Sequence, residues 1–454
     1  MRIAESGLAA GPVRMRQPPL RLPLADILCA LIFAFFAVQG AIPGIAPGQA
    51  LEATNAAPTP LMRIGGIASQ VVIDGTILLF LLKDARLLAR RILSLGYAAL
   101  FAALVIFSTL WSIDPLLTLR RSLAFTLAGF FGLWFASRFP LRRQISILML
   151  SMVLLALGAA FVAVCFPQIG LDHSPGHHSD WQGVFTQKNA CGRIMVLATA
   201  VVLCQRRLTI PRLAALSLFV FVLVMSGSRG AWLIEAAVFV LSLLLRLMRR
   251  MEQRGRVLLG LAAAVLTAAM AAAAVLFLSQ LTGLLGRDAT LSGRTAIWTQ
   301  VWSFIRKQPW LGYGYGAFWQ GIHGPSFRVA ATVHFIVFHA HNGFLEIWLD
   351  LGAAGLLLFL LTYLRAWRRL WPALRRGQID QAAWPLFLLV LIALYDLDEN
   401  TLLIYNGLFW VLYVSALAHI EGLAAGRRAE MPPPSFRDEI PSETVDAPHP
   451  LLSY

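Results

Sequence analysis

Apolar and polar stretches alternate along almost the whole chain, and the apolar stretches are long. A helix needs about 20 apolar residues to cross the hydrocarbon core of a bilayer. Candidate helices of about this length, twelve in number, lie near residues 24–42, 66–83, 92–110, 120–137, 145–166, 191–205, 211–226, 230–247, 257–281, 342–364, 383–396 and 402–420. The pattern therefore predicts an all-α fold, a polytopic transmembrane helical bundle of about twelve spans.

The connections between these stretches are of two kinds. Every second connection is rich in arginine and lysine: those around residues 14–21, 83–91, 138–143, 206–212, 246–256 and 365–376. The alternate connections carry mainly turn, aromatic, histidine or acidic residues: 111–115, 167–190, 226–230, 282–341 and 396–400. Because basic connections stay on the cytoplasmic side, we expect the first set inside the cell and the second set outside.

An even number of spans places both termini in the cytoplasm, as expected for a multi-pass protein of a bacterial inner membrane. The predicted segments are a cytoplasmic start (1–23), nine spans (24–281), one large periplasmic loop (282–341), three spans (342–426) and a disordered cytoplasmic tail (427–454). The loop mixes turn residues with aromatic and basic ones, and we expect a short amphipathic helix around Thr295 to Lys307.

Composition favours a membrane protein over a soluble one, and it gives no support to nucleic-acid binding, a zinc cluster or a disulfide framework. Hydrophobic residues make up 58% of the 454 positions and charged residues only 13%, and the mean hydropathy is +0.70, whereas a soluble chain carries about 25% charged residues. The net charge of +15 does not predict nucleic-acid binding, because the basic residues lie in short clusters between spans. The four cysteines have no CxxC spacing, so neither a zinc cluster nor a disulfide framework is expected.

Two arginines at outward-facing span ends are candidates for binding an anion. Arg229 lies in the tight turn Ser226-Gly-Ser-Arg-Gly, and Arg294 lies near the start of the expected loop helix. A guanidinium group donates paired hydrogen bonds to phosphate and keeps its charge, which suits a diphosphate. The alternatives are an interface anchor for Arg229 and a solvated surface residue for Arg294.

A histidine cluster at the mouth of the tenth span is the candidate for proton transfer. The segment His339-Ala-His341-Asn342 is followed by Glu346. An imidazole with a pKa near neutrality can act as a general base towards a hydroxyl, although a single histidine is more often a packed or solvated residue.

A third group, Lys188, Asn189 and Arg193, lies at the outer end of the sixth span. These side chains either bind an anionic substrate or anchor the helix. His173, His177 and His178 lie just upstream, but no carboxylate pattern completes them as a metal site. No metal site is therefore predicted.

Together these clusters resemble motifs of the O-antigen ligase and Wzy-type polysaccharide polymerase superfamily, most closely its exopolysaccharide polymerase branch. His341-Asn342, nine residues and Gly352-Ala-Ala-Gly355 are similar to the ligase signature, except that Leu356 and Leu357 replace its final Thr-Gly. The turn at 226–230, the segment 293–314, the segments 111–121 and 181–192, and Asp398-Glu399-Asn400 with Trp410 also look like family motifs, with Gln187 in place of an expected histidine. The resemblance covers roughly residues 108–415.

The resemblance implies a glycosyltransferase C-type-like fold and an undecaprenyl-diphosphate-linked oligosaccharide as donor. By analogy, Arg229 and Arg294 would bind the leaving diphosphate, His341 would take the proton of the acceptor hydroxyl, and the anomeric carbon would be inverted. Lys188, Asn189, Arg193, His339, Asn342, Glu346 and Glu399 would support the site. The family needs no cofactor, and its polymerases are expected to work in the membrane with a flippase and a chain-length regulator.

Three functions remain open at this point. A polymerase would use another lipid-linked repeat unit as acceptor, whereas an O-antigen ligase would use a lipid A core or another acceptor. The missing Thr-Gly and the segments typical of the polymerase branch favour the polymerase. A transporter for polyprenyl-linked sugars would need polar sites near the bilayer midplane, whereas the polar residues here gather at the outward-facing ends of the spans.

Overall fold

The computed structural model describes residues 23–42, 46–47, 60–173, 179–276, 294–321, 323–334 and 336–426. Nearly all of the predicted cytoplasmic start and the whole predicted tail lie outside these residues, as does the first part of the predicted loop. The described part of the chain is helical apart from one antiparallel pair of two-residue strands, β1 (Ala41–Ile42) and β2 (Ala46–Pro47). The predicted all-α class is confirmed.

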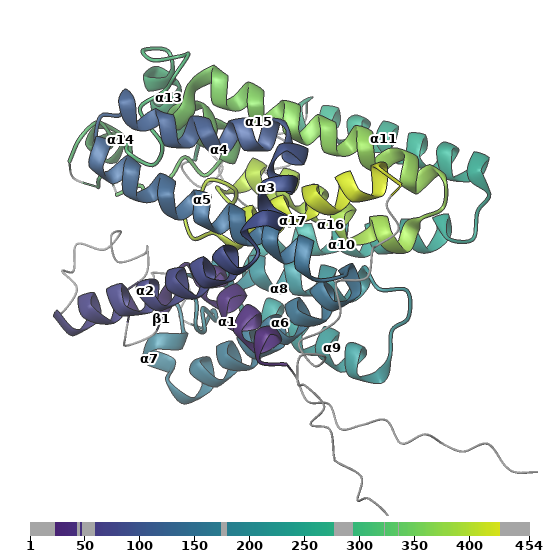
Figure 1. Cartoon of the computed structure of the whole chain (residues 1–454). Coiled ribbons are helices and arrows are strands. Elements are labelled where there is room, and N and C mark those ends of the chain that lie inside the picture. Colours follow the sequence, from purple (N-terminus) through teal and green to yellow (C-terminus); the bar gives the residue numbers. More distant parts are fainter. Residues whose placement is uncertain are drawn as a thin grey trace, which may run out of the picture.

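Each of the twelve predicted apolar stretches contains a helix (Figure 1). They are α1 (Leu24–Ala37), α2 (Pro60–Lys83), α4 (Tyr97–Phe107), α5 (Pro115–Arg138), α6 (Leu141–Cys165), α8 (Lys188–Leu203), α9 (Ile210–Met225), α10 (Arg229–Met248), α11 (Gln253–Leu276), α15 (Gly343–Arg375), α16 (Ile379–Asp398) and α17 (Leu408–Ala424). Shorter helices are α3 (Ala85–Ile92), η1 (Leu93–Leu95), η2 (Ser108–Leu110), α7 (Pro167–Gly170), α13 (Arg294–Ile305) and α14 (Ser326–Val333). Helix α13 confirms the helix expected within the loop.

Not every one of these helices is long enough to cross a membrane by itself. Within the described residues, six helices have the length and apolar composition of a span, namely those at 63–83 and α5, α6, α10, α15 and α16. A seventh span results if the bent pair Ala85–Leu95 and Tyr97–Leu110 is taken as one, and α1, α9 and α17 are shorter apolar helices. The chain is thus a multi-pass membrane protein, and the total of about twelve spans stays a prediction.

Glycines break two of the predicted spans. The helix axis turns by 99° between Ala85–Leu95 and Tyr97–Leu110, and Gly96 at the turn has a φ of +55° with the guanidinium of Arg365 packed against it. Gly352 interrupts α15 with a φ of +66°. A side chain at Gly352 would overlap the carbonyl group of Trp310. Apolar length predicts neither break, because each depends on a contact with a residue far away in the sequence.

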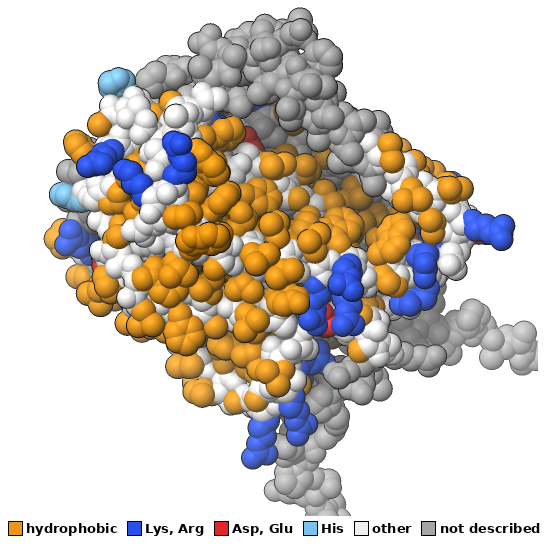
Figure 2. Space-filling view, turned by 90° about the horizontal axis from the view of Figure 1, so that it is seen from above, with side chains coloured by type: hydrophobic (Ala, Val, Ile, Leu, Met, Phe, Trp, Pro, Cys, Tyr) orange, Lys and Arg blue, Asp and Glu red, His pale blue; other side chains and the backbone are white. Residues whose placement is uncertain are grey.

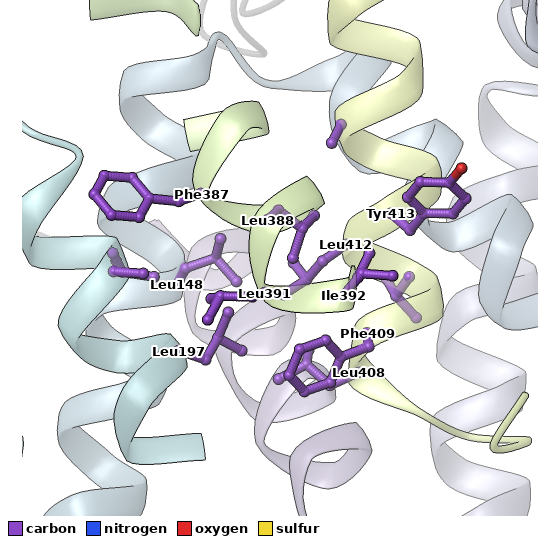
Figure 3. Close-up of a cluster of buried hydrophobic side chains, with 14 of the residues drawn as sticks. Leu148, Leu197, Phe387, Leu388, Leu391, Ile392, Leu408, Phe409, Leu412 and Tyr413 are labelled. Atoms are coloured by element: carbon purple, nitrogen blue, oxygen red, sulfur yellow. The ribbon is translucent and has the colours of Figure 1, made fainter. Parts of the chain in front are cut away.

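The helix α16 lies at the centre of the bundle. Figure 3 shows Phe387, Leu388, Leu391 and Ile392 of this helix between side chains of α17 and those of α6 and α8. Of the residues in its most apolar window, 72% are buried. The position of α16 matters for the site, because its last residue, Asp398, and the following Glu399 are the acidic groups described below.

Close packing fixes α17 against α5. A Cβ atom at Gly132 would lie 2.3 Å from the carbonyl oxygen of Val411, so the two backbones approach as only glycine allows. The indole of Trp410 stacks on Phe125 with a centroid distance of 4.3 Å and donates a 3.0 Å hydrogen bond to the Phe125 carbonyl oxygen. These contacts hold α17, the helix that follows the connection 399–407, against α5.

The outer surface of the bundle is strongly apolar. Figure 2 shows a broad hydrophobic face with Lys and Arg side chains mostly toward its margins. Helix α2 contributes to this character, since Ile64, Ile67, Val71 and Leu79 are each about two thirds exposed. A surface of this kind is stable in lipid rather than in water.

The connections predicted to face outward meet at one end of the bundle. Ile113 donates a backbone hydrogen bond to Tyr313, and Trp181 donates one to Met225. The chain after α16 is bonded to Arg294 and His341. At the opposite end, Arg249 pairs with Asp380. The two groups of connections therefore lie at opposite ends, in agreement with the predicted alternation, and we call the first end the site end.

Two segments that resemble family motifs, the loop 309–314 and the first part of α15, are hydrogen-bonded to each other at the site end. The backbone of the loop 309–314 runs beside the break in α15, where Ala353 donates to the Pro309 carbonyl at 2.8 Å and Gly314 donates to the Asp350 carbonyl at 2.9 Å. The helices α13 and α14 pack beside these two segments at the start of α15 (Figure 1). The loop thereby holds the residues that precede α15 in place.

Candidate active site

Glu399 is the centre of the polar cluster at the site end. It directly follows α16, and only 6% of its side chain is exposed. Its Oε2 lies 3.2 Å from Nδ1 of His341 and 3.6 Å from Nε2 of His339, and its Oε1 accepts a 3.3 Å hydrogen bond from Arg294. A buried carboxylate is stable only when it is paired in this way.

The hydrogen bonds define which nitrogen of each imidazole carries the proton. The backbone N–H of His341 donates to Nδ1 of His339 at 3.2 Å, so His339 carries its proton on Nε2, which faces Glu399. The contact of His341 Nδ1 with the Glu399 carboxylate places the proton of this ring on Nδ1. In the neutral form of this ring, Nε2 of His341 carries no proton and can accept one.

The same surroundings set the ionisation of Glu399 and His339. Burial opposes the charge on Glu399, but the hydrogen bond from His341 and the electrostatic influence of both imidazoles and of Arg193 outweigh it and lower the pKa of the carboxyl to about 2. Burial lowers the pKa of His339 to about 3, and the positive charges of Arg193 and Arg294 act in the same direction. At neutral pH the cluster therefore contains a carboxylate and a neutral His339.

The backbone at His341 is held in an uncommon conformation. Its φ of +49° lies in the left-handed region, which costs a residue other than glycine about 1–3 kcal/mol. The preceding Ala340 is fixed on both sides, because its N–H donates to Glu346 at 2.7 Å and its carbonyl accepts from the Trp298 indole at 2.9 Å. The imidazole of His341 is thus positioned before any substrate binds.

Asn342 and Glu346 support this conformation from the start of α15. The side chain of Asn342 caps the helix by accepting the N–H of Leu345 at 3.0 Å and donates to the Leu397 carbonyl at 3.3 Å. The second carboxylate oxygen of Glu346 accepts the Trp319 indole N–H at 2.8 Å. Neither side chain is bonded to the His341 ring, so both act by positioning the backbone.

Arg294 lies at the start of α13 and is paired with two consecutive acidic residues. Its guanidinium group contacts Asp398 and donates to Glu399. The Asp398 carboxylate also lies against the first turn of α10, where a Cβ atom on Gly230 would be 3.0 Å from its Oδ2. Asp398 thus connects Arg294 with the residue that follows Arg229.

Arg229 is the first residue of α10, and it is exposed. Among the described residues, no ion pair or hydrogen bond engages its side chain. The hydroxyl of Ser228, the N-cap of α10, donates to Asn189 at 3.1 Å instead of capping the helix. The first turn of α10 therefore presents a charged guanidinium and backbone N–H groups at the site end.

The remaining predicted residues lie on the first turns of α8. Lys188 pairs with Asp180 at 2.7 Å, and Asn189 is bonded to Ser228. Arg193 is 6% exposed, and its charge acts on both Glu399 and His339. The structure thus joins Arg193 to the histidine cluster, whereas Lys188 and Asn189 fix the turn at 226–228 beside it.

The histidine cluster also has the geometry of a metal site, although the sequence predicted none. Among the described side chains, His339, His341 and Glu399 form one group with ligand atoms within 4.8 Å of one another. Two cations oppose a divalent ion there, because Arg294 is bonded to Glu399 and the charge of Arg193 acts on the same carboxylate. Hydrogen bonds and guanidinium groups already balance the charge of this carboxylate.

Sequence reasoning missed the central contacts rather than the residues. It placed Glu399 among the supporting groups but not beside His341, and it included Asp398 and Trp298 in family motifs without giving either a role in the site. Trp319 was not singled out, and no sequence signal points to it, because its hydrogen bond to Glu346 depends on the path of the loop.

Comparison with known proteins indicates what this chain is similar to. The family model described as "O-Antigen ligase" matches residues 214–360, a segment that includes Arg229, Arg294 and His341. The resemblance to the O-antigen ligase and Wzy-type superfamily is confirmed. The chain is also similar to the exopolysaccharide production protein ExoQ of Rhizobium meliloti (strain 1021), with 29% identity over 285 residues. The match covers 59% of this chain and 62% of the length of that relative.

Proposed function

We propose that this chain is an inverting membrane glycosyltransferase that polymerises undecaprenyl-diphosphate-linked oligosaccharide repeat units into a surface polysaccharide. The observation that carries the proposal is the contact of His341 with Glu399 beside Arg294, which combines a proton acceptor and an anion-binding cation in one place. The similarity to the ligase family model and to an exopolysaccharide production protein supports the substrate class.

In this reaction the acceptor hydroxyl attacks the anomeric carbon of the donor sugar. Nε2 of His341 takes the hydroxyl proton while Glu399 stabilises the imidazolium that forms. The bond between the anomeric carbon and the diphosphate oxygen breaks with inversion, and the electron pair leaves with the diphosphate. Arg294 and Arg229 stabilise the charge that develops on this leaving group.

The proposed topology follows the distribution of basic residues. The site end faces the periplasm of a bacterial inner membrane, residues 282–341 form the large periplasmic loop, and both termini lie in the cytoplasm. The donor is then used on the side opposite to that of its synthesis, which requires a flippase, and a chain-length regulator is the expected partner. The reaction uses no metal ion, so a chelator should leave the rate of the purified enzyme unchanged.

A ligase that transfers the glycan to lipid A core or another acceptor is the second candidate, favoured by the description of the matching family model. The two functions differ in the acceptor, whereas the donor and the roles of His341 and the arginines are the same. The departures of Leu356 and Leu357 from the ligase signature favour the polymerase.

Analysis of surface polysaccharide in a strain that lacks this protein separates the two functions. The strain is complemented with the wild type or with His341→Ala, and the sizes and lipid linkage of the glycans are measured. A polymerase predicts single repeat units on the lipid carrier, with long chains restored by the wild type alone. Long chains that accumulate on the carrier without reaching an acceptor would identify a ligase. Normal polysaccharide in the deletion strain would refute both.

A further inference from the structure

Asp398 and Glu399 are adjacent in the sequence but differ in their surroundings. Glu399 is 6% exposed and faces both histidines, whereas the Asp398 side chain is 40% exposed and its contacts are with Arg294 and the first turn of α10. Removing Glu399 from its partners would leave a buried charge unpaired, which is costly. Asp398 can move into water at little cost, because an exposed ion pair contributes little.

The carboxylate of Asp398 lies where positive groups from two elements meet. One is the guanidinium of Arg294, and the other is the first turn of α10 at Gly230, next to Arg229, which has no partner among the residues that the structure describes. The N-terminus of a helix carries a partial positive charge and free N–H donors. Asp398 therefore lies where the proposed function requires the diphosphate, and it supplies a negative charge there.

We propose that Asp398 is a built-in competitor of the diphosphate. It holds Arg294 when the site is empty, gives way when the lipid-linked donor binds, and returns to Arg294 as the undecaprenyl diphosphate product leaves. This inference rests on the proposed function, since it assumes that Arg294 binds the diphosphate. Its consequence is that Asp398 weakens binding of both donor and product and thereby speeds product release.

Binding of inorganic pyrophosphate to the purified full-length protein tests the inference. Calorimetric titration compares the wild type with Asp398→Asn, which keeps the size of the side chain and removes its charge. We expect pyrophosphate to bind the variant about threefold to tenfold more tightly, because one competing ion pair of about 1 kcal/mol is lost. In turnover, product inhibition by undecaprenyl diphosphate should strengthen by the same factor.

Asp380→Asn is the matched control, because Asp380 pairs with Arg249 and Arg206 at the opposite end of α16. It should leave pyrophosphate affinity unchanged. Equal gains in both variants would show a general charge effect and would overturn the competitor role, as would unchanged or weaker binding in Asp398→Asn.

Arg294→Ala separates this inference from the proposed function. If this variant binds pyrophosphate as tightly as the wild type does, the assumed anion site is wrong and the proposed function loses its support. If it loses binding while Asp398→Asn gains none, only the competitor role of Asp398 is refuted.

Discussion

The two ends of α16 carry acidic residues paired with arginines, yet they differ in what the pairs can do. At its start, Asp380 is 52% exposed and lies 2.9 Å from Arg249. At its end, Glu399 is 6% exposed and contacts Arg294 together with two histidines. An exposed pair of the first kind contributes about 0–1 kcal/mol. The pair of Glu399 and Arg294 differs because it is buried and lies beside two imidazoles, which are groups that can accept and release a proton.

The comparison predicts a large difference between neutralising the two ends. Glu399→Gln should reduce transfer about 10²-fold to 10⁴-fold, because an amide cannot stabilise an imidazolium and can favour the wrong tautomer of His341. Asp380→Asn should stay within about twofold of the wild type. Both effects are measured as rates of glycosyl transfer by the purified variants from a lipid-linked donor. Similar losses of rate in the two variants would contradict the claim that only the acidic group at the site end takes part in the reaction.

The arginines allow a second comparison of the two ends, with a smaller expected effect. Arg229→Lys should weaken donor binding about tenfold, because an ammonium group cannot reproduce the paired hydrogen bonds of a guanidinium. The matched control is Arg250→Lys, which changes an arginine next to Arg249 at the opposite end and should leave binding unchanged. The measurement is the dissociation constant of the lipid-linked donor for each of the two variants and for the wild type. Equal affinities in the two variants would mean that Arg229 is only an interface anchor.

The smallest predicted effect concerns stability and pH. The pKa of His339 is lowered to about 3 by burial and by neighbouring positive charge, whereas an unfolded chain has a histidine pKa near 6.5. The unfolded state thus binds the extra proton between these values, and stability falls as the pH drops from about 6.5 toward 3. His339→Asn should flatten this dependence of the thermal midpoint. An unchanged slope in the variant would assign the dependence to other groups.

The positions of the helices were predictable because apolar length is a local signal, and each of the twelve apolar stretches contains a helix. The number of spans and the sides on which the connections lie stay predictions. The breaks at Gly96 and Gly352 were not predictable, since Arg365 and Trp310 reach them from distant parts of the chain.

The candidate site was predicted less completely than the fold. Motif order indicated His341, Arg229 and Arg294, but it gave no contacts between elements. The pairing of Glu399 with His341 and of Asp398 with Arg294 joins residues 58 and 104 positions apart. The sequence left open whether Lys188 binds an anionic substrate or anchors its helix, and in the folded chain it is paired with Asp180. Only the folded chain shows which charges are already balanced.

The central claim is that His341 transfers the proton and does not bind the donor. The most direct test measures donor binding and glycosyl transfer on the same preparation of His341→Ala, with His419→Ala at the opposite end of the bundle as control. We expect transfer to fall by about 10²-fold to 10⁴-fold while donor affinity stays within about threefold of the wild type. Retained transfer, or a loss of binding as large as the loss of transfer, would contradict the central claim.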